Sequence, residues 1–289
     1  MSRVRTSSPA PINTFMTFST LAHAKLNLSF DKELFIKEYD ERIYPKSFPI
    51  SAGIESINRT IKLNQTWNMV DPNIYEQINT NRVDEKGVYT PIDRGRKSWV
   101  MRQLLEMDTA GVTDPVLLKF ASIGGVGLRN AAYQHNFKVK DECKDLQIVD
   151  WIYKNLPFEK IVSIHCVALD PGSFAPIHRD DKSLFDNRSS IGTNLFYKNN
   201  FVIININVSS GGVPLCWGLD MPNADKCYKA DDDVYLTNDY FLHGVPQVTS
   251  RRRQIRVSGI PRPEMYELLD KQMMVDVGPD YIFNPMYPG

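Results

Sequence analysis

The stretch IVSIHCVALDPG at residues 161–172 decides the fold class of this chain. Its apolar and β-branched residues are typical of a buried strand, and its last three residues form an Asp-Pro-Gly turn. Similar runs lie at residues 201–208, 233–236 and 254–260, with turn-forming residues at 209–214 and 222–224. No helical pattern of about ten residues separates them, which favours an antiparallel two-sheet fold. We therefore expect a mainly β protein with flanking α: a double-stranded β-helix, or cupin-like jelly roll.

Helical patterns flank this β-rich region on both sides. Apolar residues at helical spacing predict helices over residues 31–43, 114–120, 145–156 and 263–274. The apolar residues within 46–112 show neither a helical nor a strand spacing that would assign an element. The predicted organisation is a flexible tail (1–13), a mixed helical flank packed on the core (14–156), the double-stranded β-helix core (157–262), and a C-terminal helix and tail (263–289).

Composition excludes several classes of protein. The 289 residues, 42% of them hydrophobic and 24% charged, are enough to bury a large core, which argues against disorder. Thirty-four basic residues balance thirty-four acidic ones, so no net field attracts nucleic acid or an anionic membrane. The longest apolar run, near residues 201–206, is far shorter than the roughly 20 residues that span a bilayer. We expect neither nucleic acid nor a membrane as a partner.

The cysteines and the N-terminus bear on the compartment. The four cysteines, at positions 143, 166, 216 and 227, form no Cys-x-x-Cys pair, which argues against a disulfide scaffold and a structural zinc module. A reducing, cytoplasmic setting fits them best. No acidic residue precedes Asp31, and this stretch lacks the apolar core of a secretory signal. We favour a flexible Ser/Pro tail, with an organellar targeting segment as the alternative.

Three residues in this β-rich region have the chemistry of a metal site. His178 and Asp180 follow the Pro-Gly turn, and His243 begins a later predicted strand. On a strand, side chains two positions apart share a face, so His178 and Asp180 can chelate one ion. Two imidazoles and one carboxylate are the ligand set of a non-haem iron(II) site. For His178-Arg179-Asp180 taken alone, the alternative is a surface loop rich in charge.

Several arginines follow His243, and this residue type suits a dicarboxylate. A guanidinium can hold a carboxylate with two parallel, charge-assisted hydrogen bonds. Arg253 lies ten positions after His243, and its rivals are Arg251, Arg252 and Arg256. Strand alternation puts Arg253 on the face of Ile255 and Val257, and turns Arg252 and Arg256 to the other face.

Residues 162–263 resemble the iron(II) and 2-oxoglutarate-dependent oxygenases, and in detail the aspartyl/asparaginyl β-hydroxylase-like branch. The resemblance rests on the ordered set His178, Asp180, His243 and Arg253, with the Pro-Gly turn and the His-Gly-Val context. It implies Fe(II) bound by the first three residues, 2-oxoglutarate bound by Arg253, and O2 as co-reactant. Members of the branch can lack the carboxylate ligand, whereas Asp180 is present here. Halogenating relatives replace it, so an intact Asp180 favours hydroxylation or desaturation.

The resemblance implies a dioxygenase that hydroxylates a C–H bond and releases succinate and CO2. Its substrate would be a peptide or protein residue, or an amino-acid-like small molecule. The alternatives are a cupin-type hydrolase or isomerase that uses zinc or manganese, and a non-catalytic jelly-roll binding protein.

Polar residues elsewhere are secondary candidates. Asn205 and Asn207 alternate inward on the strand at residues 201–208, where they would bind the cosubstrate or belong to a buried polar network. His165 is a core residue or a pocket wall, His135 a candidate for lining a substrate channel, and His23 has no assigned role.

Overall fold

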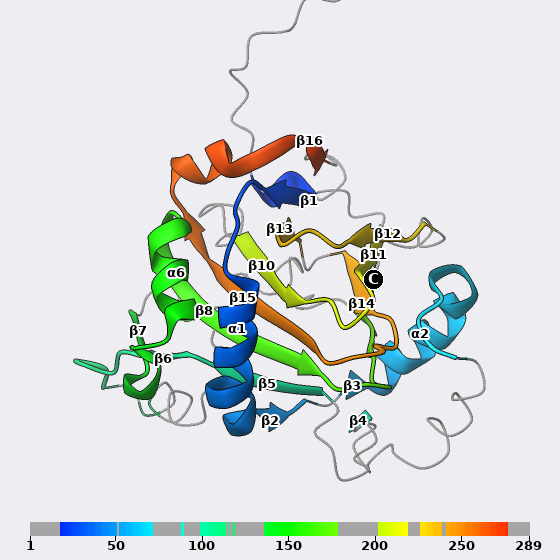
Figure 1. Cartoon of the computed structure of the whole chain (residues 1–289), viewed down its shortest axis with the longest axis horizontal. Helices are drawn as coiled ribbons and strands as arrows, with labels where there is room; N and C mark the ends of the chain where they lie inside the picture. Colours follow the sequence, from blue (N-terminus) through cyan, green and yellow to red (C-terminus); the bar gives the residue numbers. More distant parts are fainter. Residues whose placement is uncertain are drawn as a thin grey trace, which may run out of the picture.

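Two antiparallel sheets form the centre of the described part of the chain (Figure 1). The structure is a computed structural model, and it describes residues 18–50, 52–71, 88–89, 99–113, 115, 118, 136–178, 202–218, 226–238 and 241–276. The predicted tail at residues 1–13, most of the helix predicted at 114–120, and both Asp180 and His135 lie outside these residues.

The strands after residue 157 cross between the two sheets at every step except from β11 to β12, which are neighbours in the small sheet, and from β15 to the later β16 (Leu269–Asp276), which both lie in the large sheet. The strands up to residue 261 are β8 (Phe158–Leu169), β9 (Ala175–His178), β10 (Val202–Ser209), β11 (Leu215–Gly218), β12 (Tyr228–Ala230), β13 (Val234–Thr237), β14 (Leu242–Val245) and β15 (Arg252–Pro261). The large sheet contains β13-β10-β15-β8 as neighbours, and the small sheet has the order β12-β11-β14-β9. This strand order is the topology of a double-stranded β-helix, so the predicted fold class is confirmed.

Strands from outside this region widen the large sheet. Its full order is β16-β1-β13-β10-β15-β8-β5-β2, which adds β1 (Leu21–Leu26), β2 (Phe48–Pro49), β5 (Trp99–Gln103) and β16 (Leu269–Asp276). Two small ladders, β3 (Ala52–Gly53) with β4 (Val88–Tyr89) and β6 (Leu105–Met107) with β7 (Phe137–Val139), lie outside it. The sequence predicted none of these strands. Most of them are short and acquire their pairing from residues distant in the chain, and the longer β16 lies in a segment with apolar residues at helical spacing.

The C-terminal prediction is corrected by the structure. Residues Pro263–Leu268 form the 3-10 helix η9, but the chain then extends as β16 and pairs with β1. The apolar residues Met265, Leu268 and Leu269 have helical spacing, yet a free sheet edge at β1 offers backbone hydrogen bonds that outweigh local propensity. The predicted helix over residues 263–274 is therefore wrong beyond Leu268.

Two of the predicted helices are present, and a third helix was missed. Helix α1 (Lys32–Glu38) continues through a π-helical turn, η2 (Tyr39–Ile43), and Asp31 Oδ1 caps it by accepting from Leu34 N at 3.0 Å. Helix α6 (Gln147–Asn155) matches the prediction over 145–156. Helix α2 (Ile54–Trp67) falls in the region without a clear period. No helix among the described residues is long and apolar enough to cross a lipid bilayer.

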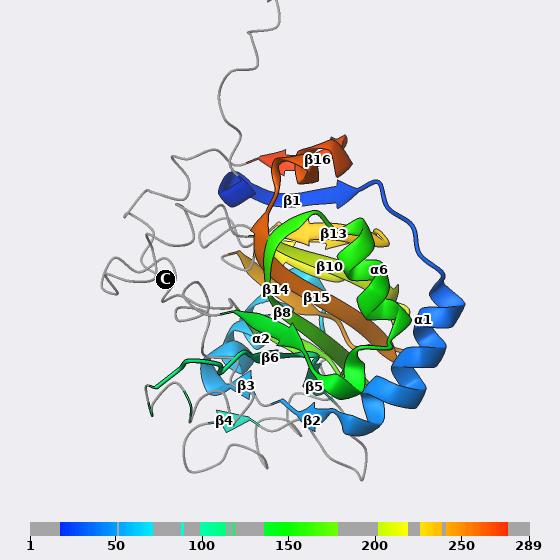
Figure 2. The ribbon, with the colours of Figure 1, turned by 90° about the vertical axis from the view of Figure 1, so that its left-hand side faces the viewer.

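The sheets and helices form layers. Helices α1 and α6 cover one face of the large sheet (Figure 2), where the main core contains Phe35, Ile152, Ile204 and Ile255. The opposite face of the large sheet looks toward the small sheet. Helix α2 covers the outside of the small sheet, and its Trp67 belongs to a second core cluster with strands β9, β11 and β14. The large sheet is therefore covered on both faces.

Glu38 connects α1 to α6, and its replacement is expected to destabilise the protein. Its carboxylate oxygens each accept from one backbone N–H at the start of α6, those of Gln147 and Ile148, at 2.8 Å. Glu38 is buried, and the N-cap residue of α6 makes no side-chain cap. Glu38→Gln should lower the free energy of unfolding in denaturant by about 1–2 kcal/mol, since it removes the charge and one acceptor.

The exposed Glu41, on the same segment, provides a matched control for this change. Glu41→Gln should alter the free energy of unfolding by less than about 0.5 kcal/mol. Equal effects of the two substitutions would contradict a capping role for Glu38.

Candidate active site

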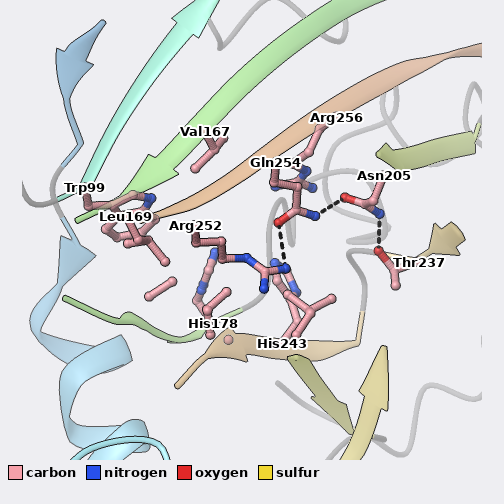
Figure 3. Close-up of a pocket in the computed structure, with 14 residues that line it drawn as sticks. Trp99, Val167, Leu169, His178, Asn205, Thr237, His243, Arg252, Gln254 and Arg256 are labelled. Carbon is pink, nitrogen blue, oxygen red and sulfur yellow. Dashed lines mark hydrogen bonds between the residues drawn. The ribbon is translucent and has the colours of Figure 1, made fainter. Parts of the chain in front are cut away.

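A pocket lies between the two sheets, inside the double-stranded β-helix (Figure 3). The large sheet contributes Trp99, Val167, Leu169, Asn205, Thr237, Arg252, Gln254 and Arg256. The small sheet contributes Ala175, His178, Leu215, His243, Gly244 and Val245. The pocket therefore combines an apolar part with two histidines and two arginines, and none of these lining residues is acidic.

The two histidines of the pocket lie side by side on adjacent strands. His178 ends β9 and His243 lies on β14, and they are partners in the antiparallel register. Their ring centroids are 4.4 Å apart. The Nδ1 atoms of His178 and His243 lie 2.6 Å and 3.0 Å from the carbonyl oxygens of Pro176 and Phe241. Because a carbonyl only accepts, Nδ1 of each neutral ring carries the proton, and Nε2 keeps the lone pair that a metal needs.

The third predicted ligand, Asp180, lies outside the described residues. Within the described ranges, no group of three His, Cys, Asp or Glu side chains is placed to hold a metal ion. The structure thus brings together His178 and His243 but gives no position for the carboxylate. Asp180 follows His178 by two residues in the sequence.

Arg253, the predicted carboxylate anchor, points away from the pocket. Its Nε donates to Asp40 Oδ1 at 2.8 Å and its Nη2 to Asp40 Oδ2 at 2.5 Å, on the face of the large sheet that η2 covers. Arg253 does share a face with Ile255 and Val257, as expected, but both of these residues pack in the core beneath α1 and α6. The prediction chose the arginine on this apolar face. The pocket lies on the opposite face of β15.

The Asp40–Arg253 pair is expected to contribute to stability. Both hydrogen bonds are charge-assisted, and the Arg253 side chain is only 13% exposed. A double-mutant cycle with Asp40→Asn and Arg253→Gln should give a coupling energy of about 1 kcal/mol or more in unfolding experiments. The exposed pair Asp141–Lys144 is the control, with an expected coupling below about 0.5 kcal/mol. Equal coupling in both pairs would contradict a structural role for the Asp40–Arg253 contact.

A network beside this pair fixes the turn that precedes the histidine motif. The Tyr44 hydroxyl donates to Asp170 Oδ2 at 2.6 Å, and Arg251 Nε donates to Asp170 Oδ1 at 2.8 Å. The Arg251 guanidinium also stacks over the Tyr44 ring at 3.8 Å. Burial, together with the bond to Asp170, raises the pKa of Tyr44 to about 12. Arg251, like Arg253, therefore binds groups outside the pocket.

Arg252 faces the pocket and is almost completely buried, at 1% exposed. Its Nη1 donates to the carbonyl oxygens of Ser210 and Val213 at 3.0 Å and 2.8 Å, and its Nη2 to Gln254 Oε1 at 3.3 Å. Its Nε has no hydrogen-bond partner among the described residues. Burial lowers the pKa of Arg252. A buried guanidinium held by neutral groups is well placed for an anionic ligand, which would offset the loss of hydration.

A glycine turn makes this position of Arg252 possible. Gly211 has a φ of +68°, and a Cβ there would lie 2.8 Å from Arg252 Cβ. Glycine tolerates both the left-handed backbone and the close approach. The turn before β11 can therefore bring its carbonyl groups to the guanidinium.

The two candidate asparagines differ in their surroundings. Asn205 lines the pocket, donates from Nδ2 to Thr237 Oγ1 at 2.8 Å, and accepts at Oδ1 from Gln254 Nε2 at 2.7 Å. Gln254 Nε2 also donates to the Tyr235 hydroxyl at 3.2 Å, and burial raises the pKa of Tyr235. Asn207 is buried but does not line the pocket. Asn205 is thus part of a polar network in the pocket wall.

The remaining described histidines lie away from the pair. His165 Nε2 lies 3.0 Å from Gln103 Nε2. His23 is buried, with its Nε2 3.5 Å from Asp232 Oδ2 and its ring stacked on Trp217. Neither residue lines the pocket.

Sequence reasoning assigned no site role to several lining residues, including Trp99, Thr237 and Gln254. A signal for the pocket face was nevertheless present on β15, where polar side chains alternate with apolar ones at Arg252, Gln254, Arg256 and Ser258. Such a polar row on a buried strand needs internal partners or a ligand.

Comparisons with known proteins assign no family to the chain. No protein-family model matches the sequence, and no curated protein matches it. Among solved structures, a prolyl-4-hydroxylase from Pseudomonas putida is 10% identical, with 85% of this chain and 95% of that chain covered and a TM-score of 0.37. A prolyl hydroxylase from Trichoplax adhaerens, in complex with a hypoxia inducible factor oxygen degradation domain peptide fragment, is 10% identical, covers 82% and 91%, and has a TM-score of 0.29. Likenesses this low carry no functional argument and do not confirm the aspartyl/asparaginyl branch.

Proposed function

We propose that this chain is a non-haem Fe(II) and 2-oxoglutarate-dependent dioxygenase that hydroxylates a C–H bond. One observation carries the proposal: two adjacent imidazoles, His178 and His243, share a pocket with the buried guanidinium of Arg252. A metal site needs the histidines, and a dicarboxylate cosubstrate needs the arginine. A cupin-type hydrolase or isomerase would need only the metal ligands, so the buried arginine favours the oxygenase.

The residues fit the proposed metal. His178 and His243 would hold iron(II) through Nε2, while their Nδ1–H groups bond to backbone carbonyls and fix the ring orientation. Asp180 is proposed as the third ligand, from its place in the sequence motif. Bound iron(II) would supply the oxidative chemistry that couples O2 and 2-oxoglutarate to hydroxylation, with release of succinate and CO2.

We assign the carboxylate anchor to Arg252 in place of Arg253. Arg252 faces the pocket, whereas Arg253 is bonded to Asp40 on the other face of β15. The Gln254 side chain bonds to Arg252 and to Asn205, so it restricts how the guanidinium can turn. Preorganised donors of this kind bind a carboxylate without first having to become ordered.

The substrate is proposed to be an amino-acid-like small molecule or a residue of a peptide or protein. Trp99, Val167 and Leu169 supply an apolar wall that would contact the hydrocarbon part of such a substrate and keep water away from it. Membership of the aspartyl/asparaginyl β-hydroxylase-like branch is part of this proposal and rests on the sequence motif alone.

An optical titration tests the function. The anaerobic protein should develop a visible charge-transfer band when Fe(II) and 2-oxoglutarate are both present, and neither alone should produce it. Addition of O2 should then yield succinate, and removal of iron with a chelator should abolish both signals. A folded protein that binds Zn(II) or Mn(II) but never develops the band would contradict the proposal and favour the hydrolase or isomerase.

A further inference from the structure

Two of the four cysteines lie next to each other on the small sheet. Cys216 is on β11, and Cys227 directly precedes β12, the strand beside β11 (Figure 1). These two strands are antiparallel, with Trp217 opposite Tyr228. Each cysteine precedes one of these partners by one residue, so both cysteines project from the face of the sheet that Trp217 does not occupy. Two thiols from different strands therefore share one face.

The packing agrees with this register. Cys216 belongs to the core cluster that α2 covers, and Cys227 packs against the same cluster. Trp217, which is paired with His243, belongs instead to the cluster between the two sheets. The thiols of Cys216 and Cys227 share a hydrogen bond. The two cysteines are thus in contact with each other, and the small sheet separates them from the histidine pair.

The two thiols differ in access and in acidity. Cys216 is buried, whereas Cys227 is partly exposed. The hydrogen bond with Cys216 lowers the pKa of Cys227, and the positive charge of Lys229 acts in the same direction, against the effect of partial burial. The same hydrogen bond, together with burial, raises the pKa of Cys216. Because the thiolate is the reactive form of cysteine, Cys227 is the thiol that reacts first with an oxidant in solution.

The other two cysteines provide a contrast. Cys143 and Cys166 are both fully buried in the main core. Burial raises the pKa of each of these thiols. Of the four cysteines, all of which the structure describes, Cys227 alone combines exposure with a lowered pKa. An oxidant should therefore act at Cys227 and spare the core pair.

We propose that Cys216 and Cys227 form a reversible disulfide when a peroxide oxidises Cys227. The Cys227 thiolate attacks one oxygen of hydrogen peroxide, the O–O bond breaks, and the products are a sulfenic acid and, after uptake of one proton, water. The Cys216 sulfur then attacks the sulfenic sulfur, the S–O bond breaks, and the thiol proton leaves with the hydroxyl group as a second water. Two thiols lose two electrons in total, and the peroxide gains them. No metal takes part, so the inference is independent of the proposed oxygenase function.

The position of Cys227 makes the bond geometrically accessible. A disulfide needs Cβ atoms about 3.5–4.5 Å apart. Cys227 lies just outside the β11–β12 ladder, which ends at the Trp217–Tyr228 pair, so its backbone can approach Cys216 without breaking that pairing. The bond would tie the edge strand β12 to β11, and β11 is the neighbour of the strand that carries His243.

A thiol count during oxidation tests the inference on the full-length protein. A chromogenic thiol reagent, added under denaturing conditions, should detect four thiols in the reduced protein. Hydrogen peroxide should consume the two thiols of the pair, and dithiothreitol should then restore all four. A metal chelator in the buffer prevents radical formation at any bound iron.

Peptide mapping identifies which cysteines are bonded. Trypsin cleaves after lysine, and Lys226 lies between the two cysteines in the sequence. A digest of the oxidised protein without reductant should therefore contain residues 199–226 joined to residues 227–229. Treatment of that digest with dithiothreitol should release the two peptides separately.

Three single variants separate the roles of the thiols. Cys227→Ser should slow the loss of thiols at least about tenfold, because the reactive thiolate is absent. Cys216→Ser should leave Cys227 as a sulfenic acid that dimedone traps, because the second thiol is absent. Cys143→Ser is the matched control, and the disulfide should form in it as fast as in the parent protein.

Several results would overturn the inference. Peroxide that leaves the thiol count of the parent protein unchanged would do so, as would lost thiols that dithiothreitol does not restore. A disulfide that joins Cys143 to Cys166, or one protein molecule to another, would also contradict it. So would a loss of thiols from Cys227→Ser at the parental rate. The parent protein alone decides the first three outcomes, and none of them involves 2-oxoglutarate, so a failure here leaves the proposed function intact.

Discussion

His178→Ala and His243→Ala are each expected to abolish Fe(II)-dependent succinate formation. Each substitution removes one of the two imidazoles that lie 4.4 Å apart in the pocket. Loss of a hydrogen-bond partner of a metal ligand costs roughly 10–100-fold in affinity or activity, so loss of a ligand should cost at least about 100-fold. Equilibrium binding of Fe(II), followed by the charge-transfer band with 2-oxoglutarate, measures the effect directly.

His165→Gln is the matched control for these substitutions. His165 is another buried strand histidine, but it does not line the pocket. Its replacement should leave Fe(II) affinity within about twofold, even where the free energy of unfolding falls by about 1 kcal/mol. Retention of Fe(II) binding by a folded His178→Ala or His243→Ala protein would mean that the histidine pair is not the metal site.

Arg252→Gln is expected to weaken 2-oxoglutarate binding by about 10–100-fold. A hydrogen bond to a charged group contributes about 1.5–3 kcal/mol, and each 1.4 kcal/mol is a factor of ten in affinity. Fe(II) affinity without cosubstrate should change little, because Arg252 is not a ligand. Titration of 2-oxoglutarate into the anaerobic Fe(II) protein measures the change.

Arg253→Gln provides the strongest control, since it changes the same residue type one position along the chain. It should destabilise the fold through the loss of the Asp40 contact and leave 2-oxoglutarate affinity unchanged. Arg252→Lys is a second variant in case Arg252→Gln misfolds. It keeps a positive charge beside the carbonyl oxygens of Ser210 and Val213, which accept hydrogen bonds from Arg252. If Arg253→Gln weakened cosubstrate binding while Arg252→Lys and Arg252→Gln did not, the anchor assignment would be reversed.

Local patterns predicted the long, buried elements well. Strands β8, β10 and β15 contain runs of β-branched residues, and α1 and α6 have apolar residues at helical spacing. Such patterns reflect interactions within a few residues, which are visible in the sequence. The strands β1 and β5 were missed because their pairing depends on partners far along the chain, and β16 was missed because its segment has apolar residues at helical spacing. Helix α2 was missed because its mixture of Asn, Thr and charged residues obscures the apolar stripe that packs on the small sheet.

The fold class could be predicted from the sequence, because strand periodicity and turn residues are local properties. The two histidines were assigned to one site by their resemblance to the ordered set of an oxygenase family. Which face of β15 lines the pocket became clear from the packing of the whole molecule. Both faces of this sheet are buried. The alternation of side chains along a strand divides its residues between the two faces, but it does not show which face lines the barrel. Here the apolar face, with Ile255 and Val257, packs beneath the helices, whereas the polar face, with Arg252 and Arg256, looks into the barrel. The packing of α1 and α6 on the large sheet therefore sets which arginine can reach a ligand.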